Sequence, residues 1–477
     1  MCKPPPHRRL RSHRSDRPCS AVTRTGIAAG ASKAHRKPPP MHLTKPTSPF
    51  GSPPATGGGS PRPNDGAARS ATNRCESRMR QCRFSGFRTT LRHRLWSAVM
   101  VGVAAWNAAA APVTPGACVL GAEKPTGADG SSVAAVMPVY RAGVGGYHTY
   151  RIPALLKTRQ GTLLAFCEGR KQNARDHGDI DLLLRRSSDG GRTWSDQQIV
   201  YEEGGTASIT IGNPCPVQDA QTGTIWLPFC RDNDRVFVTF SNDDGNTWAK
   251  PREITDDVKE RNWGWFATGP GHGIQLTRGP HAGRLIVPCD CRVGPGRDKW
   301  NSFGHSLIVY SDDHGRTWKR GRLTAAGMNE CQAVELTDGR LLLSMRNYRG
   351  EQRRAFAYSS DGGITWSQPF LHPQVYCPTC QAALHRYRWK PTSILLYSGP
   401  AGPGRRNVSL RISTDEGKTW PRTIRVFDGP SAYSDIAVLD DGDVLVLLEC
   451  GEKSPYESIA LVRVPAATVT GDPLRAR

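Results

Sequence analysis

The chain has 477 residues and a formal net charge of +22 at pH 7. Residues 1–95 hold 20 of the 64 Lys and Arg but 3 of the 42 Asp and Glu, so this part alone carries +17 of that charge. The remainder is close to neutral, and the basic leader lacks interleaved aromatic residues, so the composition argues against nucleic acid as a partner.

The N-terminal part reads as a leader followed by an export signal. Residues 1–94 are basic and rich in Pro, Gly and Ser, so they cannot bury enough apolar surface to order themselves, and translation could instead begin at Met79. Residues 95–111 are apolar and end in Ala, which after a basic run is typical of a signal peptide. The run is short for a membrane span. We therefore predict a linker over 112–134 and a secreted or periplasmic protein with no stable membrane insertion after cleavage. An uncleaved membrane anchor is the alternative.

An eight-residue pattern, Ser-x-Asp-x-Gly-x-Thr-Trp, occurs five times in the following part of the chain. The copies begin 54, 70, 48 and 54 residues apart, at Ser187, Ser241, Ser311, Ser359 and Ser413. A recurring period of this size indicates a repeat architecture. In each copy the Asp can accept backbone N–H bonds, the Gly permits a positive φ and the Trp can anchor the turn in the core. Five equivalent Asp residues cannot share one reaction centre, so we interpret these boxes as structural.

Each box follows a β-rich run such as residues 236–240 or 306–310, and further runs begin after a Gly, as at 161–166. About four short strands per repeat fit one blade of a propeller. The length of residues 135–465 divided by the mean spacing gives about six repeats. We predict an all-β fold, a six-bladed β-propeller over 135–465 whose last blade takes strands from both ends, and a C-terminal tail over 466–477.

Ten Cys residues lie from Cys118 onward. Cys377 and Cys380 form a CxxC pair, but no second CxxC or HxxxH is present to complete a zinc site. We expect buried thiols or disulfides, no catalytic metal and no cofactor.

The motif Tyr150-Arg151-Ile152-Pro153 precedes the first box. Together with the boxes it resembles the sialidase (neuraminidase) family over about residues 135–465. The resemblance implies an exo-α-sialidase that hydrolyses sialylated glycoproteins, glycolipids or oligosaccharides with retention, through a sialyl-tyrosine intermediate. Two alternatives are a non-catalytic glycan-binding propeller and a hydrolase of another acidic sugar.

Sialic acid carries a carboxylate on its anomeric carbon, and guanidinium groups bind carboxylates bidentately. The family uses three Arg residues for this purpose. The resemblance assigns these roles to Arg151, Arg346 and Arg405, with Arg406 as a rival for the third.

The same carboxylate would repel an Asp or Glu nucleophile but not a neutral phenol, and sialidases use Tyr. The resemblance assigns the nucleophile to Tyr433 and its proton acceptor to Glu330. It assigns the general acid to Asp176, with Asp179 and Asp181 as rivals in the same loop.

Two supporting residues are implied as well. Arg170 would contact the sugar, and Glu449 would orient the first Arg of the site. Residues 263–273 resemble the substrate-side loop of the family, although core packing of Trp263 and Trp265 is an equal alternative. His272 in this loop lacks the nucleophile elbow that a Ser-His-Asp triad of the α/β-hydrolase type would need.

Overall fold

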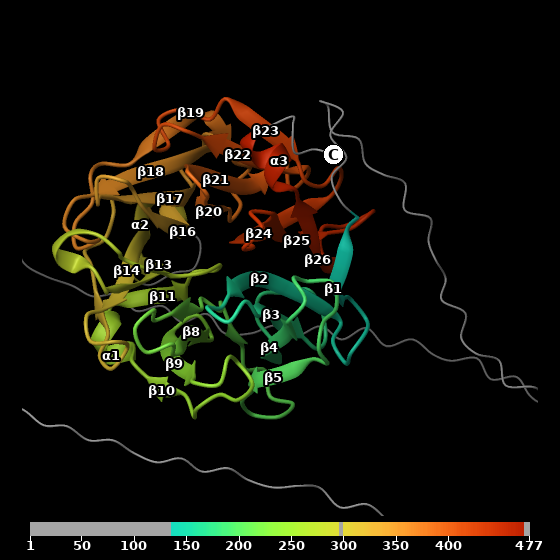
Figure 1. The fold of residues 1–477 in the computed structure, drawn as a ribbon. Helices are drawn as coiled ribbons and strands as arrows, with labels where there is room; N and C mark the ends of the chain where they lie inside the picture. Colours follow the sequence, from blue (N-terminus) through green and yellow to red (C-terminus); the bar gives the residue numbers. More distant parts are fainter. Residues whose placement is uncertain (1–134, 295–298, 472–477) are drawn as a thin grey trace, which may run out of the picture. The chain divides into compact units, whose positions relative to one another are not determined.

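The computed structural model describes residues 135–294 and 299–471. The predicted leader, signal segment and linker lie outside these residues, and so does Cys118. Within the described part, six antiparallel sheets are arranged as a ring (Figure 1), which confirms the predicted six-bladed β-propeller.

Each blade is one antiparallel sheet, and its strands are as follows. Blade I holds β2 (Thr149–Lys157), β3 (Leu163–Arg170), β4 (Ile180–Ser187) and β5 (Gln198–Tyr201). Blade II holds β6 (Ile211–Gly212), β7 (Val217–Gln218), β8 (Ile225–Arg231), β9 (Arg235–Ser241) and β10 (Arg252–Glu253). Blade III holds β11 (Trp263–Thr268), β12 (Ile274–Gln275), β13 (Leu285–Val293), β14 (Gly304–Ser311) and β15 (Lys319–Arg320). Blade IV holds β16 (Met328–Glu335), β17 (Leu341–Asn347), β18 (Arg353–Ser359) and β19 (Phe370–Tyr376). Blade V holds β20 (Ala383–Trp389), β21 (Thr392–Pro400), β22 (Val408–Ser413) and β23 (Arg422–Arg425). Blade VI holds β24 (Ser431–Val438), β25 (Val444–Cys450), β26 (Ser458–Val464) and β1 (Met137–Arg141).

The last blade closes the ring with strands from both ends of the propeller, as the sequence predicts. Strand β1 pairs antiparallel with β26, with Met137 opposite Leu461. Apolar side chains then fill the space between neighbouring blades, in six clusters that each join two adjacent sheets of the described chain. The core is therefore a ring of interfaces, which fixes the blades around the central axis.

The helices of the described residues are short: α1 (Thr255–Val258), the 3₁₀ turn η1 (Gly279–His281), α2 (Trp300–Phe303) and α3 (Ala466–Thr470). No helix in residues 135–294 and 299–471 has the length and apolar character needed to cross a bilayer. Helix α3 begins the segment that we expected to be a tail. Its Val469 packs against the core between blades V and VI, and Arg422 donates to its carbonyl groups.

The predicted boxes connect the last two strands of each of blades I to V. In the first copy, Ser187 Oγ accepts the N–H of Gly191 at 2.9 Å, and Asp189 accepts the N–H of Thr193 at 3.0 Å. Gly191 has a φ of 86°, and a Cβ there would lie 2.5 Å from Leu461. Equivalent bonds recur in the other four copies. The Trp of each copy packs against an inter-blade cluster, so the boxes are structural turns.

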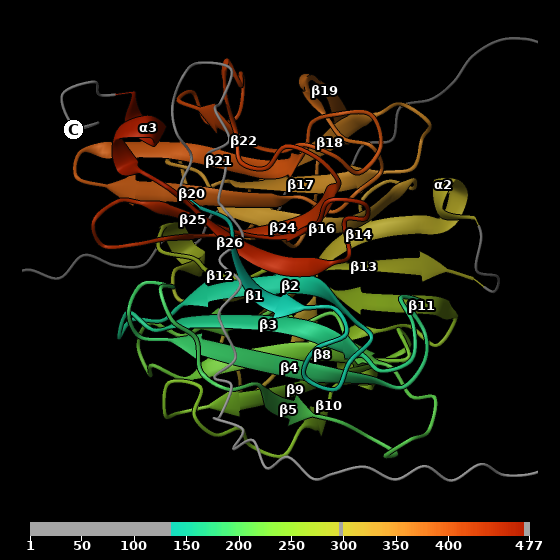
Figure 2. The same cartoon turned by 90° about the vertical axis from the view of Figure 1, so that its right-hand side faces the viewer.

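The first strand of a blade begins at the face of the ring where the second strand ends. In blade I, Thr149 at the start of β2 pairs with Arg170 at the end of β3. Figure 2 shows the ring from the side, and this face is on the right, where α2 lies. The box of blade I lies at the other face, because Ser187 pairs with Leu163 at the start of β3. Functional groups at the strand starts are thus separated from the boxes by the length of a strand.

Candidate active site

All six blades contribute to one pocket at the face where the first strands begin. Seven of the eight residues expected at the site line it: Arg151, Arg170, Asp176, Glu330, Arg346, Arg405 and Tyr433. The other lining residues are Ile152, Glu168, Asn213, Asn233, Trp265, Ala267, Asp290, Trp300, Asn329 and Tyr348. The eighth expected residue, Glu449, has no exposed surface and contacts Arg151. Arg406, the rival of Arg405, does not line this pocket.

Irregularities in three first strands place the side chains at the pocket. The register of β2 against β3 shifts between Arg151 and Ala154. Equivalent shifts in β16 and β24 flank Glu330 and Tyr433, between Met328 and Cys331 and between Ser431 and Ser434. A β-bulge redirects a side chain from the regular alternation of a strand. The three bulges therefore lie at the positions that bring these side chains together.

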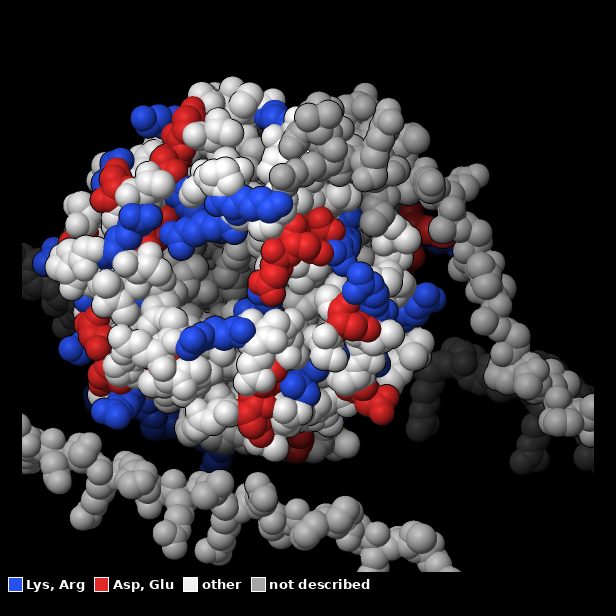
Figure 3. All heavy atoms as spheres, viewed as in Figure 1, with Lys and Arg blue, Asp and Glu red and all other residues white. Residues whose placement is uncertain are grey.

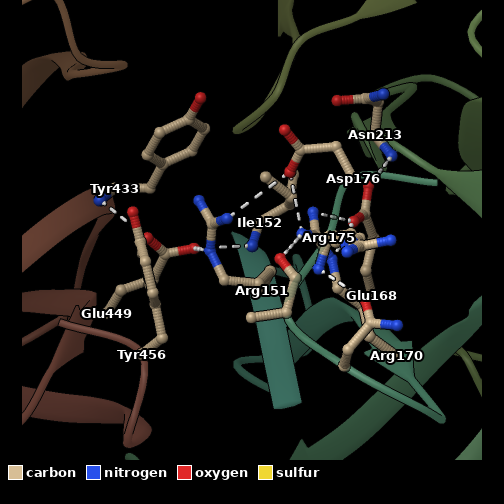
Figure 4. A network of polar contacts seen from close by, with 12 residues as sticks. Arg151, Ile152, Glu168, Arg170, Arg175, Asp176, Asn213, Tyr433, Glu449 and Tyr456 are labelled. Carbon is tan, nitrogen blue, oxygen red and sulfur yellow. Dashed lines mark hydrogen bonds and ion pairs between the residues drawn. The ribbon is translucent and has the colours of Figure 1, made fainter. Parts of the chain in front are cut away.

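Glu449 holds Arg151 and the backbone around it (Figure 4). Its Oε1 accepts the Arg151 Nε–H at 2.6 Å and the Ile152 N–H at 2.9 Å, and its Oε2 accepts the Tyr433 N–H at 3.2 Å. Ile152 has a φ of 61°, which is costly for a β-branched residue. One buried carboxylate thus satisfies a guanidinium, stabilises a strained backbone and ties β2 to β24.

Tyr433, Glu330 and Arg346 form a hydrogen-bonded triangle. The Tyr433 hydroxyl donates to Glu330 Oε1 at 2.5 Å, and Arg346 Nη1 donates to Glu330 Oε2 at 2.7 Å and to the Tyr433 hydroxyl at 3.0 Å. Burial and the charge of Glu330 raise the pKa of Tyr433 well above its usual value, although Arg346 and Arg405 oppose them. The phenol is therefore neutral at rest, with a proton acceptor and a cation in contact with its oxygen.

Asp176 lies in the loop between β3 and β4, with 70% of its side chain exposed. Its Oδ1 accepts from Arg170 Nη1 at 2.8 Å and lies 3.6 Å from Arg151 Nη1 (Figure 4). Partial burial raises the pKa of Asp176, but the charges of Arg170 and Arg151 outweigh this effect and hold the pKa below its usual value. Arg170 itself is buried and donates twice to Glu168 Oε2.

The two rivals of Asp176 lie elsewhere. Asp179 and Asp181 are buried, and both form an ion pair with Lys171, at 3.1 and 3.2 Å. Asp181 also accepts the Tyr147 hydroxyl at 2.5 Å. Neither lines the pocket, so the structure brings Asp176, and not these two residues, to the other groups.

Asp290 on β13 is a pocket residue that the sequence reasoning missed. Its Oδ2 accepts from Trp265 Nε1 at 3.1 Å and from Asn329 Nδ2 at 2.9 Å, while its Oδ1 has no hydrogen-bond partner within the described chain. Burial and the charge of Glu330 raise the pKa of Asp290 well above its usual value. A carboxyl group between two Cys residues of a largely apolar strand was the signal that could have found it.

Tyr456 is a second residue that was missed. It lies between β25 and β26, its ring is 4.1 Å from the Arg151 guanidinium, and its hydroxyl accepts from Arg405 Nη1 at 2.8 Å. Loops between strands carry no periodicity, so the sequence offered no signal for this position.

The residues of the segment 263–273 lie in different parts of the propeller. Trp265 lines the pocket, whereas Trp263 is buried in the cluster between blades II and III. His272 lies in a second pocket at the opposite face, where its Nδ1 is 2.7 Å from Asp435 and its Nε2 is 3.0 Å from His385. Figure 3 shows this opposite face, where the centre of the ring is hollowed and basic and acidic side chains lie on the rim.

The nine Cys residues of the described chain are buried free thiols, so the alternative of disulfides among them does not hold. In the same part of the chain, no group of three or more His, Cys, Asp or Glu residues is arranged to hold a metal ion.

Comparison with known proteins places this chain in a family. A profile described as a BNR repeat-like domain matches residues 161–446. Sialidase-3 of Mus musculus is 31% identical over 389 residues, and the alignment covers 65% of this chain and 90% of that protein. The chain belongs to the sialidase family. The sialidase of Micromonospora viridifaciens is 34% identical over 381 residues, covering 74% of this chain. The alignment spans 58% of that relative's length.

A solved sialidase structure has the same fold. The structure described as Hadza microbial sialidase Hz136 superposes with a TM-score of 0.63 and 27% identity, covering 72% of each chain. Family membership and fold are thus shown.

Proposed function

We propose that this chain is an exo-α-sialidase that releases terminal sialic acid with retention of configuration. The observation that supports this most directly is the contact of the Tyr433 hydroxyl with Glu330 and Arg346, in a pocket that three further guanidinium groups line. A neutral phenol beside a carboxylate acceptor is suited to attack a carbon that already bears an anionic group. The substrates would be sialylated glycoproteins, glycolipids or oligosaccharides.

The three guanidinium groups would hold the substrate carboxylate. Arg151, Arg346 and Arg405 come from blades I, IV and V, and all three face the pocket around Tyr433. Forked guanidinium–carboxylate contacts fix both position and orientation. Anchoring the carboxylate in this way would set the anomeric carbon beside the phenol.

In the first half of the reaction, Asp176 gives its proton to the leaving oxygen as the bond from that oxygen to the anomeric carbon breaks. The Tyr433 oxygen forms a bond to the same carbon, and the phenolic proton passes to Glu330. Arg346 stabilises the developing phenolate because its Nη1 already contacts that oxygen at 3.0 Å. The product of this half is a covalent sialyl-tyrosine.

In the second half, the Asp176 carboxylate takes a proton from water as the water oxygen attacks the anomeric carbon. The bond to Tyr433 breaks, and the phenol recovers its proton from Glu330. Two inversions at one carbon give net retention.

Binding of the substrate would itself prepare Asp176 to act as an acid. The charge of Arg151 contributes to the lowered pKa of Asp176 in the free protein. A substrate carboxylate paired with Arg151 cancels much of that charge, and the pKa of Asp176 then rises. The acid would thus become protonated mainly when a substrate is present.

The decisive experiment is release of 4-methylumbelliferone from its α-sialoside by the wild type and by Tyr433→Phe. We expect turnover by the wild type and a loss of at least about 10³-fold in the variant. Absence of release by a folded wild type would favour a glycan-binding propeller without catalysis. Parallel assays with the deaminated sialoside would distinguish a hydrolase specific for another acidic sugar.

We also propose that the enzyme is exported, on the basis of the basic, apolar and small-residue order in residues 79–111. Sequencing the N-terminus of the mature protein tests this proposal. A mature N-terminus close after Ala111 is expected, and a retained apolar segment would indicate a membrane anchor instead.

A further inference from the structure

The three guanidinium groups that we propose to bind the substrate carboxylate are held in different ways. Arg151 is paired with Glu449 at 2.6 Å, and Arg346 is paired with Glu330 at 2.7 Å. Within residues 135–294 and 299–471, Arg405 has no carboxylate at ion-pair distance. Its Nη1 donates instead to the hydroxyl of Tyr456 at 2.8 Å. One of the three is therefore positioned by a neutral group.

Tyr456 contacts a second guanidinium through its ring. The Arg151 guanidinium carbon lies 4.1 Å from the centre of that ring (Figure 4), and the ring packs against a small cluster that includes Ile152 and Tyr433. A guanidinium over an aromatic face is attracted by the ring quadrupole. One side chain thus fixes the separation of Arg151 and Arg405, which stand 254 positions apart in the sequence.

The loop that carries Tyr456 is itself held firmly. The Glu457 carboxylate accepts the backbone N–H groups of Glu452, Lys453 and Ser454 at 3.0, 2.9 and 2.8 Å. The Tyr456 N–H also donates to Ser454 Oγ at 3.3 Å. These local bonds order the loop, and none of them involves a residue that lines the pocket.

A neutral partner has a consequence that a carboxylate partner would not have. Pairing with Glu449 or Glu330 cancels most of the field of Arg151 or Arg346 at a distance. The phenol of Tyr456 orients Arg405 but leaves its charge uncompensated. Arg405 therefore keeps a positive charge that no carboxylate of the described chain offsets at ion-pair distance, and this charge favours an anionic ligand beside it.

We propose that Tyr456 is a positioning residue. It holds Arg405 at a fixed separation from Arg151, so that Arg405 faces the carboxylate of the substrate. This inference rests on the proposed function, because it assigns the ligand of the pocket as a sialic acid carboxylate. It predicts that Tyr456 contributes to binding of the carboxylate, which persists from the ground state to the transition state, and contributes little to the chemical steps.

The test compares Tyr456→Phe and Tyr456→Leu with the wild type, in the full chain, on 4-methylumbelliferyl α-sialoside. The Phe variant keeps the ring over Arg151 and loses the bond to Arg405, whereas Leu loses both. We expect KM to rise about tenfold for Phe and about 100-fold for Leu, with kcat within about twofold of wild type, because loss of uniform binding appears in KM.

Tyr387→Phe is the matched control. Tyr387 is a buried Tyr whose hydroxyl donates to the Gly442 carbonyl at 3.1 Å, away from the pocket. It should lose stability without a change in KM. The Tm of each variant separates the two effects, because a purely structural role of Tyr456 would lower Tm and leave the KM of the folded enzyme unchanged.

An unchanged KM in Tyr456→Phe would overturn the inference, and so would a fall in kcat at constant KM. Calorimetric titration with 2-deoxy-2,3-didehydro-N-acetylneuraminic acid covers the case of an inactive wild type. Weaker binding of this acid by the Phe variant would then support the role of Tyr456 while refuting hydrolysis. No binding by the wild type would refute both proposals.

Discussion

The hydroxyl of Tyr433 lies 2.5 Å from Glu330 Oε1, although 103 positions separate the two residues in the chain. Tyr433 comes from the first strand of blade VI and Glu330 from the first strand of blade IV. Closure of the ring brings the two strand starts to the same central pocket. The proposed chemistry depends on this contact, because the phenol needs a nearby group to accept its proton.

Glu330→Gln should retain the fold and lose most of the activity. The amide can still occupy the site but cannot accept the phenolic proton, so we expect kcat to fall by about 10²- to 10⁴-fold. Steady-state kinetics on the α-sialoside measures this loss, with circular dichroism as the check on folding. Near-wild-type kcat would show that another group takes the proton.

Asp176→Asn should slow the hydrolysis of substrates with poor leaving groups more than that of substrates with good ones. A phenol such as 4-methylumbelliferone leaves without much help from an acid, whereas the sugar of sialyllactose needs a proton. We expect a loss of about tenfold in kcat on the first substrate and about 10³-fold on the second. Equal losses on both substrates would argue against a role for Asp176 as general acid.

The pH profiles of kcat and kcat/KM should differ at their basic limbs. Arg170 and Arg151 hold the pKa of Asp176 below its usual value in the free protein, so its acidic form is lost at low pH. Since kcat/KM reports on the free enzyme, it should decline from acidic pH upward. The basic limb of the kcat profile should lie at higher pH, because the carboxylate of the bound substrate offsets the charge of Arg151 and so raises the pKa of Asp176. Profiles recorded from pH 3 to 8 test this order, and the reverse order would contradict it.

Glu449→Gln should destabilise the fold strongly. The amide oxygen can still accept one N–H bond, but Arg151, of which 4% is exposed, would be left as a buried charge without its partner. Breaking such a pair costs about 3–5 kcal/mol in the free energy of unfolding. Urea denaturation measures the change. Asp338→Asn breaks the exposed pair with Arg340 and serves as control, with an expected cost below about 1 kcal/mol.

Asp290→Asn should remove a pH dependence of stability. Burial and the charge of Glu330 raise the pKa of Asp290, so the native state keeps a proton that the unfolded state loses. The wild type is therefore destabilised as the pH rises from the usual Asp range toward the native pKa, by up to about 1.4 kcal/mol per pH unit. The Asn variant should gain relative stability between pH 4 and 7 in urea denaturation. A constant difference over this range would indicate that Asp290 is ionised in the native state.

The sequence sufficed for the fold because its repeats are local. Each box combines a Ser, an Asp, a Gly and a Thr whose mutual bonds lie within a few residues, and the preceding β-rich runs correspond to β4, β9, β14, β18 and β22. The spacing of the boxes then gave the number of blades. Blade VI has no box, and its existence followed from length alone.

The site could be predicted only in part. Arg151, Glu330 and Tyr433 were found through motif resemblance, and the structure brings them together at three strand bulges. Tyr456 and Asp290 were missed because their importance arises from partners that are distant in sequence. Tyr456 is defined by contacts with two Arg residues, and Asp290 by its burial next to Glu330.

The pairing of β1 with β26 has a consequence for the order of assembly. Blade VI carries both Tyr433 and Glu449, and it is complete only when the last strand of the propeller joins the first. A ribosome makes blades I to V before β24, β25 and β26 of this blade, and blades I to V contain Arg151, Glu330, Arg346 and Arg405 but not Tyr433, the proposed nucleophile. The nascent chain therefore gains the proposed nucleophile last, in the same blade whose completion closes the ring.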